Sequence, residues 1–300
     1  MSIKVKTHTF AKSRTQAKRA VIAMFKEGRI ASLGTSGAYE DALKRASDWM
    51  KSTGGGALTQ ISIKRARQYL GERAKTVSQS TLDKDRQSLQ SLLRHTGKLR
   101  EDQRLQVIKA DRETTLTSRN YTREQVDEIV KHMRPHNALA TEIAFAAGLR
   151  TVEFITIARL DDRSADARPA DIAKFCGLDD HTRYVVTGKG GLTREVRLPN
   201  DLAKRLEAVR LPSAQPRRNR GIMYLQRYKI GGGQALSESF KRASRAALGF
   251  SNGIHGTRHS YAQQRHGTAQ RLLGDPRRAK KIVSQELGHF RADITDVYLR

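Results

Sequence analysis

Residues 254–262 read Ile-His-Gly-Thr-Arg-His-Ser-Tyr-Ala and are expected to lie on one helix. His255 and Arg258 are three residues apart, so a helix presents the imidazole and the guanidinium on one face, toward one anion such as a phosphate. His255 and His259, four apart, would also suit two zinc ligands, but Gly256 stands where a metalloprotease carries its catalytic glutamate. The stretch therefore favours an anion site over a zinc site.

Two further stretches place chemically useful side chains beside a glycine that ends a helix. In Ala-Ala-Gly-Leu-Arg-Thr-Val-Glu, residues 146–153, the glycine at 148 ends a helix predicted over 138–147 and precedes Arg150. In Leu-Gly-His-Phe-Arg-Ala-Asp-Ile-Thr-Asp-Val-Tyr, residues 287–298, the glycine puts His289 at a helix terminus. Tyr298 lies nine residues further, which does not fit one continuous helical face, so a turn must bring it back toward His289.

Between these stretches, residues 184–198 predict a β-hairpin. They read Tyr-Val-Val-Thr-Gly-Lys-Gly-Gly-Leu-Thr-Arg-Glu-Val-Arg-Leu, two β-prone runs around a glycine-rich turn with Lys189 at its tip. A phosphate-binding P-loop needs a strand followed by a helix, so this glycine-rich segment does not indicate an ATPase.

Composition indicates helical cores and a polyanionic partner. The chain has 300 residues with 57 Lys+Arg against 30 Asp+Glu, a formal net charge of +27 and a pI near 10.7. Such a field steers phosphates and gains from counterion release, so nucleic acid is the expected partner, with a ribosome-associated or merely basic protein as the alternative. Because only 6% of the residues are aromatic, we expect a mainly α fold.

Cys176 is the single cysteine and makes no internal disulfide, which favours a reducing compartment. The N-terminus lacks the apolar core of a signal peptide, and no apolar run approaches the length of a membrane span. We therefore expect a cytoplasmic protein that associates with the nucleoid when bound to DNA.

The pattern along the chain predicts three regions: a basic N-terminal arm or helix over 1–34, a helical DNA-binding domain with its linker over 35–110, and a second domain over 111–300. Thr122 and Gln125 form a capping box that opens the first helix of the second domain.

Further helices are expected in the second domain, and none of the patterns repeats. Helical patterns cover residues 151–158, 202–209 and 236–247, and an arginine-rich loop around Arg217, Arg218 and Arg220 separates the last two.

The three motifs and the lysine hairpin, in this order and at these separations, resemble the tyrosine recombinase (phage integrase) family. The resemblance covers most of residues 120–298, whereas residues 35–97 share only a helical layout with the family's core-binding domain. It implies a helical core-binding domain plus an α+β catalytic domain with a small β-hairpin or sheet. Thr257 departs mildly from the leucine that the family often has there.

The chemistry of the two arginines follows from the residue type. A phosphodiester under in-line attack develops negative charge on its equatorial oxygens, and fixed cations stabilise that state more than the ground state. Arginine is planar, always charged and bidentate toward phosphate, which makes Arg150 and Arg258 the expected clamp. Losing either should cost on the order of 3 kcal/mol.

The resemblance implies the remaining roles. A tyrosine has an ordinary pKa near 10 and needs a base or a cationic field to act as a nucleophile. Tyr298 would attack the scissile phosphate, giving a 3′-phosphotyrosyl link and a free 5′-hydroxyl, with no cofactor, ATP or metal. The supporting roles would be Lys189 as general acid, His255 as general base or phosphate contact, His289 as hydrogen-bond donor to the phosphate, Glu153 as support for the site, and His259 as a structural or supporting residue.

The partners implied are double-stranded DNA, a homotetramer on two DNA sites, and a DNA-bending or directionality helper. The activity implied is site-specific recombination that integrates or excises a mobile element. The alternatives are a topoisomerase-like strand transferase without a strict site and a catalytically silent DNA-binding protein. The sequence ends two residues after Tyr298, so either subunits are linked through an element other than a long C-terminal helix or the nucleophile is delivered differently. The basic N-terminal arm either contacts DNA outside the core site or is a plain basic tail.

Overall fold

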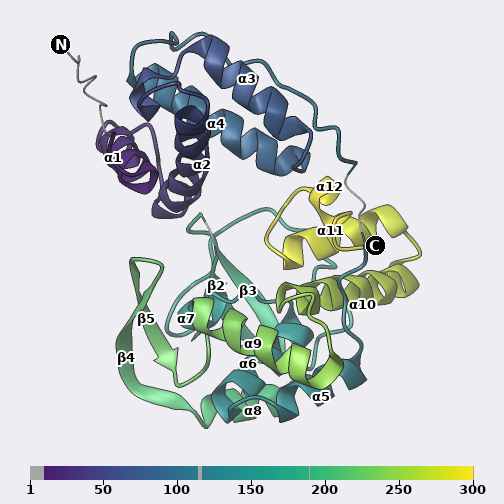
Figure 1. Cartoon of the computed structure of the whole chain (residues 1–300). Coiled ribbons are helices and arrows are strands. Elements are labelled where there is room, and N and C mark those ends of the chain that lie inside the picture. The colour runs from purple at the N-terminus through teal and green to yellow at the C-terminus, as the bar shows by residue number, and fades with distance from the viewer. Residues whose placement is uncertain (1–9, 114–116, 189, 300) are drawn as a thin grey trace, which may run out of the picture. The chain divides into compact units, whose positions relative to one another are not determined.

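Helices dominate the chain, and strands are confined to its C-terminal part (Figure 1). The computed structural model describes residues 10–113, 117–188 and 190–299. The chain divides into two compact units between residues 115 and 116. The predicted mainly α fold, with an α+β second part, is confirmed.

The N-terminal unit is a small helical bundle. Its elements are α1 (Ser13–Lys26), α2 (Leu33–Ser52), a 3₁₀ turn (Leu58–Gln60), α3 (Ile63–Ala74) and α4 (Gln79–His95). Ala17, Val21 and Met24 on one face of α1 are buried in the same core as Leu43 of α2 and Leu89 of α4. The helix expected within residues 1–34 is therefore part of this bundle's core.

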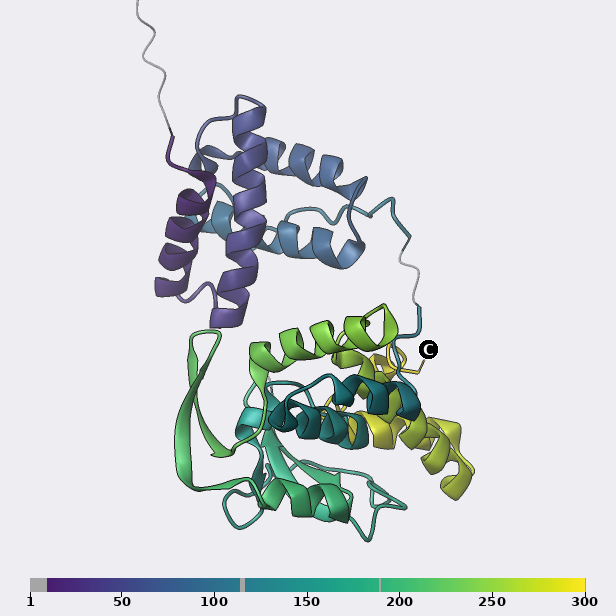
Figure 2. The same cartoon turned by 60° about the horizontal axis from the view of Figure 1, so that its bottom comes forward.

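The C-terminal unit packs helices around a three-stranded antiparallel sheet of order β1-β2-β3, with a separate two-stranded sheet, β4-β5. Figure 2 shows the helices and the sheet from a second side. The helices are α5 (Arg123–Lys131), α6 (Pro135–Ala147), α7 (Glu153–Thr156), α8 (Asn200–Glu207), α9 (Gly233–Leu248), α10 (His255–Leu273), α11 (Pro276–Glu286) and α12 (Ala292–Thr295), and the sheet strands are β1 (Ala158–Arg159), β2 (Thr182–Thr187) and β3 (Thr193–Leu198).

Several local predictions are confirmed. The capping box closes as expected, since the Gln125 backbone N–H donates to Thr122 Oγ1 at 3.2 Å and the Thr122 N–H donates to Gln125 Oε1 at 3.0 Å. β2 and β3 pair with Val185 opposite Glu195, which is the predicted hairpin. Its tip residue, Lys189, lies outside the described residues.

Two predictions of secondary structure are wrong. The helix expected over 151–158 is only the single turn α7, and the strand that follows it, β1, pairs with β2. A strand of two residues is too short to show a pattern in the sequence, so β1 was not predicted. The arginine-rich loop is instead a β-hairpin of β4 (Arg210–Asn219) and β5 (Ile222–Tyr228). The sequence of β4 does not indicate a strand, because it contains prolines and because an exposed ribbon without a buried face needs no alternation of apolar and polar residues.

No helix within residues 10–113, 117–188 and 190–299 has both the length and the apolar character needed to cross a membrane.

Gly148 joins α6 to the loop that carries Arg150, and its conformation explains the glycine. It ends α6 with φ 62°, and a Cβ there would lie 2.5 Å from the Tyr261 ring of α10. A glycine thus allows both the left-handed turn and the close approach of α6 to α10.

We predict that Gly148→Ala destabilises the C-terminal unit more than Gly249→Ala. Gly249 ends α9 in the same left-handed conformation, φ 76°, with no atom within 4 Å of a Cβ. Both variants carry backbone strain of about 1 kcal/mol, but the clash with Tyr261 adds roughly 1–3 kcal/mol at Gly148 alone. Urea unfolding followed by circular dichroism measures the difference, and equal losses would contradict the steric explanation.

Candidate active site

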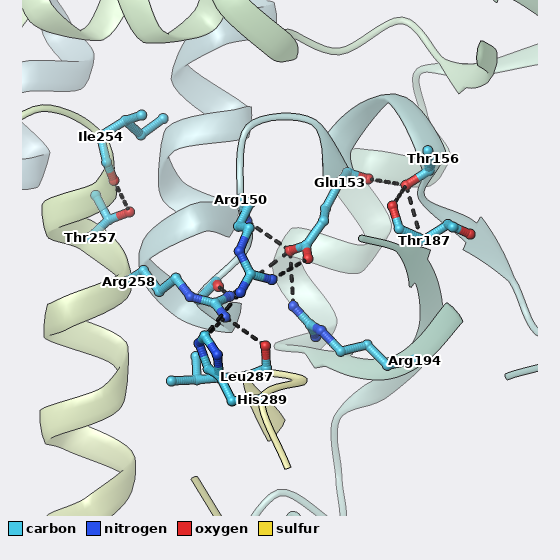
Figure 3. A network of polar contacts seen from close by, with 11 residues as sticks. Arg150, Glu153, Thr156, Thr187, Arg194, Ile254, Thr257, Arg258, Leu287 and His289 are labelled. Carbon is cyan, nitrogen blue, oxygen red and sulfur yellow. Dashed lines mark hydrogen bonds and ion pairs between the residues drawn. The ribbon is translucent and has the colours of Figure 1, made fainter. Parts of the chain in front are cut away.

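A buried carboxylate surrounded by arginines forms the floor of the site (Figure 3). Glu153, at the start of α7, is 0% exposed. Its Oε1 accepts from Arg150 Nη1 at 3.0 Å, and its Oε2 accepts from the Arg150 backbone N–H at 2.7 Å and from Arg194 Nη2 at 2.9 Å. Burial alone would raise the pKa of Glu153, but the attraction of Arg194, Arg258 and Arg150 outweighs it and lowers the pKa, so the group is ionised.

Arg258 reaches the same place from the first turn of α10 and is 0% exposed. Its Nη1 donates to the carbonyl of Gly148, and its Nη2 donates to the carbonyl of Leu287 at 2.6 Å, at the end of α11. Burial and the charge of Arg150 lower the pKa of Arg258 to about 10, which leaves it protonated at neutral pH. One guanidinium thereby ties α6, α10 and α11 together.

His289 lies against both guanidinium groups. Its Nε2 is 3.2 Å from Arg258 Nη2 and 3.4 Å from Arg150 Nη2. Arginine only donates, so Nε2 acts as the acceptor and the ring proton belongs on Nδ1. The prediction that a glycine ends the helix just before His289 is confirmed, because Gly288 has the left-handed φ of 76°.

Tyr298 comes back to this group through the turn that the spacing required. α12 ends at Thr295, and the Tyr298 backbone N–H donates to the Thr295 carbonyl at 2.8 Å. The ring is 5% exposed. The centroid of the ring lies 4.8 Å from that of His259, 5.5 Å from that of His255 and 5.6 Å from that of His289. The Cζ atom of Arg258 lies 5.6 Å from the same centroid.

The two histidines at the rim are uncharged at neutral pH. Partial burial, followed by the charge of Arg258, lowers the pKa of His289 to about 4. His255 is an exposed residue, but its ring lies against the rings of His259 and Tyr298. This partial burial, together with the charge of Arg258, also lowers its pKa to about 4. A neutral imidazole has one unprotonated ring nitrogen, and on His289 this nitrogen already accepts from the two arginines.

The structure brings most of the predicted site residues together. Arg150, His255, Arg258, His289 and Tyr298 meet at the ends of α6, α10 and α11. Glu153 pairs with Arg150, and His259 packs on Tyr298. Lys189 lies outside the described residues. The catalytic roles of these residues stay predictions.

Arg194 is a site residue that the sequence reasoning missed. It lies on β3, is buried, and pairs with Glu153 at 2.9 Å. Its Nη1 has no hydrogen-bond partner among the described residues. A signal was present, because Arg194, Val196 and Leu198 alternate on the buried face of β3, where an arginine requires a partner.

A second buried ion pair supports the site from behind. Glu286, the last residue of α11, accepts from Arg265 Nη2 at 2.8 Å and from the Tyr261 hydroxyl at 2.9 Å, both on α10. These bonds lock α11 to α10 next to Leu287, whose carbonyl holds Arg258. The spacing of Tyr261 and Arg265, four apart on one helix face, was the available signal.

Residues 22–96 match the family described as "Phage integrase, N-terminal SAM-like domain". No curated protein matches the chain by sequence.

Solved recombinases share the fold over nearly the whole chain. A structure of the XerH site-specific recombinase bound to palindromic difH substrate is 17% identical with a TM-score of 0.58, and the match covers 97% of this chain and 82% of that one. A lambda integrase dimer bound to a COC′ core site is 15% identical with a TM-score of 0.59, covering 95% and 94%. A lambda integrase tetramer bound to a Holliday junction is 14% identical with a TM-score of 0.60, covering 98% and 78%.

At these identities the structural likeness establishes the fold. The chain has the fold of tyrosine recombinases, and its residues 22–96 match a phage integrase N-terminal domain. The family resemblance predicted from the sequence is therefore confirmed.

We predict that Glu153→Gln destabilises the C-terminal unit by about 3–5 kcal/mol, because it leaves buried arginines uncompensated. In the double variant Glu153→Gln/Arg194→Met one of these charges is also removed, so part of the loss is recovered. Urea unfolding of Glu153→Gln, Arg194→Met, the double variant and the wild type tests this coupling. A double variant whose loss equals the sum of the two single losses would show that the pair does not interact.

A second prediction concerns acid stability. The folded pKa of His289, about 4, lies below the unfolded value of about 6.5, so its contribution to stability is complete above pH 6.5 and is lost as pH falls toward 4. The unfolding temperature of wild type should thus fall between about pH 7.5 and pH 5, and less so in His289→Gln. His132→Gln, at an exposed position after α5, is the control and should keep the wild-type slope. Equal slopes in all three proteins would refute this explanation.

Proposed function

We propose that this protein is a site-specific DNA recombinase that cleaves and rejoins DNA strands through a 3′-phosphotyrosyl intermediate. The observation that carries the proposal is the position of Tyr298, whose ring lies 5.6 Å from the Cζ of the buried Arg258 and beside His255 and His289. A phenol next to a fixed cation is where a scissile phosphate and its nucleophile would meet.

The reaction can be written on this chain's own residues. The Tyr298 oxygen attacks phosphorus in line, and its proton passes to neutral His255. The bond between phosphorus and the 5′ oxygen breaks, and Lys189 gives that oxygen a proton, a role that rests on the family resemblance. Rejoining is the reverse reaction, with the 5′-hydroxyl of another strand as the nucleophile. The phosphotyrosyl link conserves the energy of the broken bond.

The charges around the phosphate position favour the transition state. Arg150, Arg194 and Arg258 carry three positive charges against the one carboxylate of Glu153. Arg258 Nε, buried and without a partner among the described residues, is a donor left for an anion. His289 keeps its Nδ1 proton as a further donor, because its Nε2 faces the two arginines.

The partners follow from the same proposal. Duplex DNA is the substrate, and the excess of basic residues supplies the attraction. Recombination joins two sites, so a tetramer on two DNA sites is proposed, and the relative solved as a tetramer on a Holliday junction supports this assembly. The transposon integrase of Tn1549, 13% identical with a TM-score of 0.50, supports a role in integrating or excising a mobile element. The site of action would be the cytoplasm, on the nucleoid.

The test is formation of a covalent protein–DNA band on denaturing gels with nicked duplexes that span the ends of the gene's own locus. Wild type should give a band with certain duplexes only. Tyr298→Phe should give none, because it lacks the nucleophilic oxygen, while Tyr39→Phe in the N-terminal unit should behave as wild type.

Each other outcome has a definite reading. A band on every duplex would favour a topoisomerase-like strand transferase. A band that persists in Tyr298→Phe would exclude this tyrosine as the nucleophile. Tight binding without any band, on duplexes screened from the genome-derived ends, would favour a DNA-binding protein without catalysis.

A further inference from the structure

The β4-β5 hairpin stands apart from the layers of the C-terminal unit (Figures 1 and 2). Cross-strand partners share a face of a ribbon, so Arg218 and Met223 lie on one face with Pro216 and Leu225. Met223 is 59% exposed and Leu225 is 55% exposed, and Arg218 and Pro216 are exposed too. This outward face, the ribbon face, is covered by no other described part of the C-terminal unit.

The ribbon carries only positive charge. Residues 210–228 contain five arginines and no aspartate or glutamate. Arg210 and Arg227, at the base, pair with Asp162 at 2.8 Å and 3.8 Å. Arg217, Arg218 and Arg220, toward the tip, are exposed and form no ion pair within the described residues.

Specific bonds hold the ribbon at both ends. At the base, the Tyr228 hydroxyl donates to Glu207 Oε1 at 2.9 Å. At the tip, Asn219 Oδ1 accepts from the Gln234 N–H at 3.1 Å, and Arg220 Nη2 donates to Gln234 Oε1 at 2.6 Å. The turn residues Arg220 and Gly221 both have positive φ, 48° and 83°, which suits a tight two-residue hairpin turn. These bonds therefore fix the tip of the ribbon against α9.

The same bonds bring the tip close to the candidate active site. Gln234 lies in the first turn of α9, and Gly233 beside it donates its N–H to the carbonyl of Thr151 at 2.7 Å. Thr151 follows Arg150 directly. A phosphate held by Arg150 would thus leave the adjoining backbone of its duplex near the arginines of the ribbon tip.

We propose that the β4-β5 ribbon is a second DNA-contacting surface, with Arg218 on a backbone phosphate beside the scissile phosphate and Met223 against the sugars. The inference rests on the proposed function for its position beside the scissile phosphate. A two-stranded ribbon fits a groove of duplex DNA, and unpaired arginines are the side chains that bind phosphates.

Charge decides between DNA and a second copy of the chain as the occupant. The ribbon is wholly basic, and a second copy would bring a chain of net charge +27 against it. Like charges disfavour that contact, whereas the phosphates of a duplex release their counterions to the arginines.

The first experiment measures the salt dependence of binding to a short fluorescent duplex by anisotropy. In Arg218→Gln, the slope of log affinity against log salt should decrease by about 1, for the one lost phosphate contact. The matched control is Arg271→Gln, an exposed arginine near the C-terminal end of α10, the opposite end of that helix from His255, and it should keep the wild-type slope. A ribbon variant with the wild-type slope overturns the inference.

The second experiment places the photo-crosslinking residue p-benzoylphenylalanine at Met223 in the full-length Tyr298→Phe chain, so that no phosphotyrosyl link interferes. Crosslinking to the duplex supports the inference, and crosslinking to a second copy of the chain overturns it.

The two proposals fail separately. If wild type forms no covalent band but the slope and the crosslink are as expected, the recombinase function fails and the ribbon stands as a DNA surface. If the band forms but the slope is unchanged, only the ribbon inference fails.

Discussion

The buried carboxylate of Glu153 is the interaction on which the rest of the site depends. It accepts hydrogen bonds from Arg150 and Arg194 and lies 4.0 Å from Arg258 Nη1. These arginines come from three separate segments: the loop after α6, strand β3 and helix α10. Without the carboxylate, three cations would repel one another in a region from which water is largely excluded. The negative charge therefore makes it possible to bring the cations together.

The same arrangement leaves the site incompletely neutralised. One carboxylate offsets only one of three guanidinium groups, and buried donors on Arg194 and Arg258 have no partner among the described residues. Such donors cost stability in the free protein, and an anion that binds there would remove that cost. Burial, together with the excess positive charge, also lowers the pKa of His289 and keeps it neutral, since protonation would add a further buried cation beside Arg258. These unpaired donors lower local stability and leave a site that is suited to an anion, such as the phosphate of the proposed reaction.

Particular elements show how far the sequence could be interpreted. The capping box at Thr122 and the glycine ending α6 are local features, and both were predicted correctly because they depend only on neighbouring residues. The burial of Arg194 was missed, since an arginine within a strand is ordinarily exposed. The ribbon of β4 and β5 was missed for the opposite reason, because a strand without a buried face carries no periodic pattern.

The sequence by itself determined which residues are candidates for the chemistry, their order along the chain and the turns that join them, as in the return from His289 to Tyr298. These properties depend on residue type and on spacing, and both are written in the chain. Only the tertiary structure decided the distances, the protonation states and the burial of Glu153 and Arg194. Those properties arise where α6, β3, α10 and α11 meet, through contacts between residues 41 apart (Glu153 and Arg194) and 110 apart (Gly148 and Arg258), and no local pattern states which residues will pair.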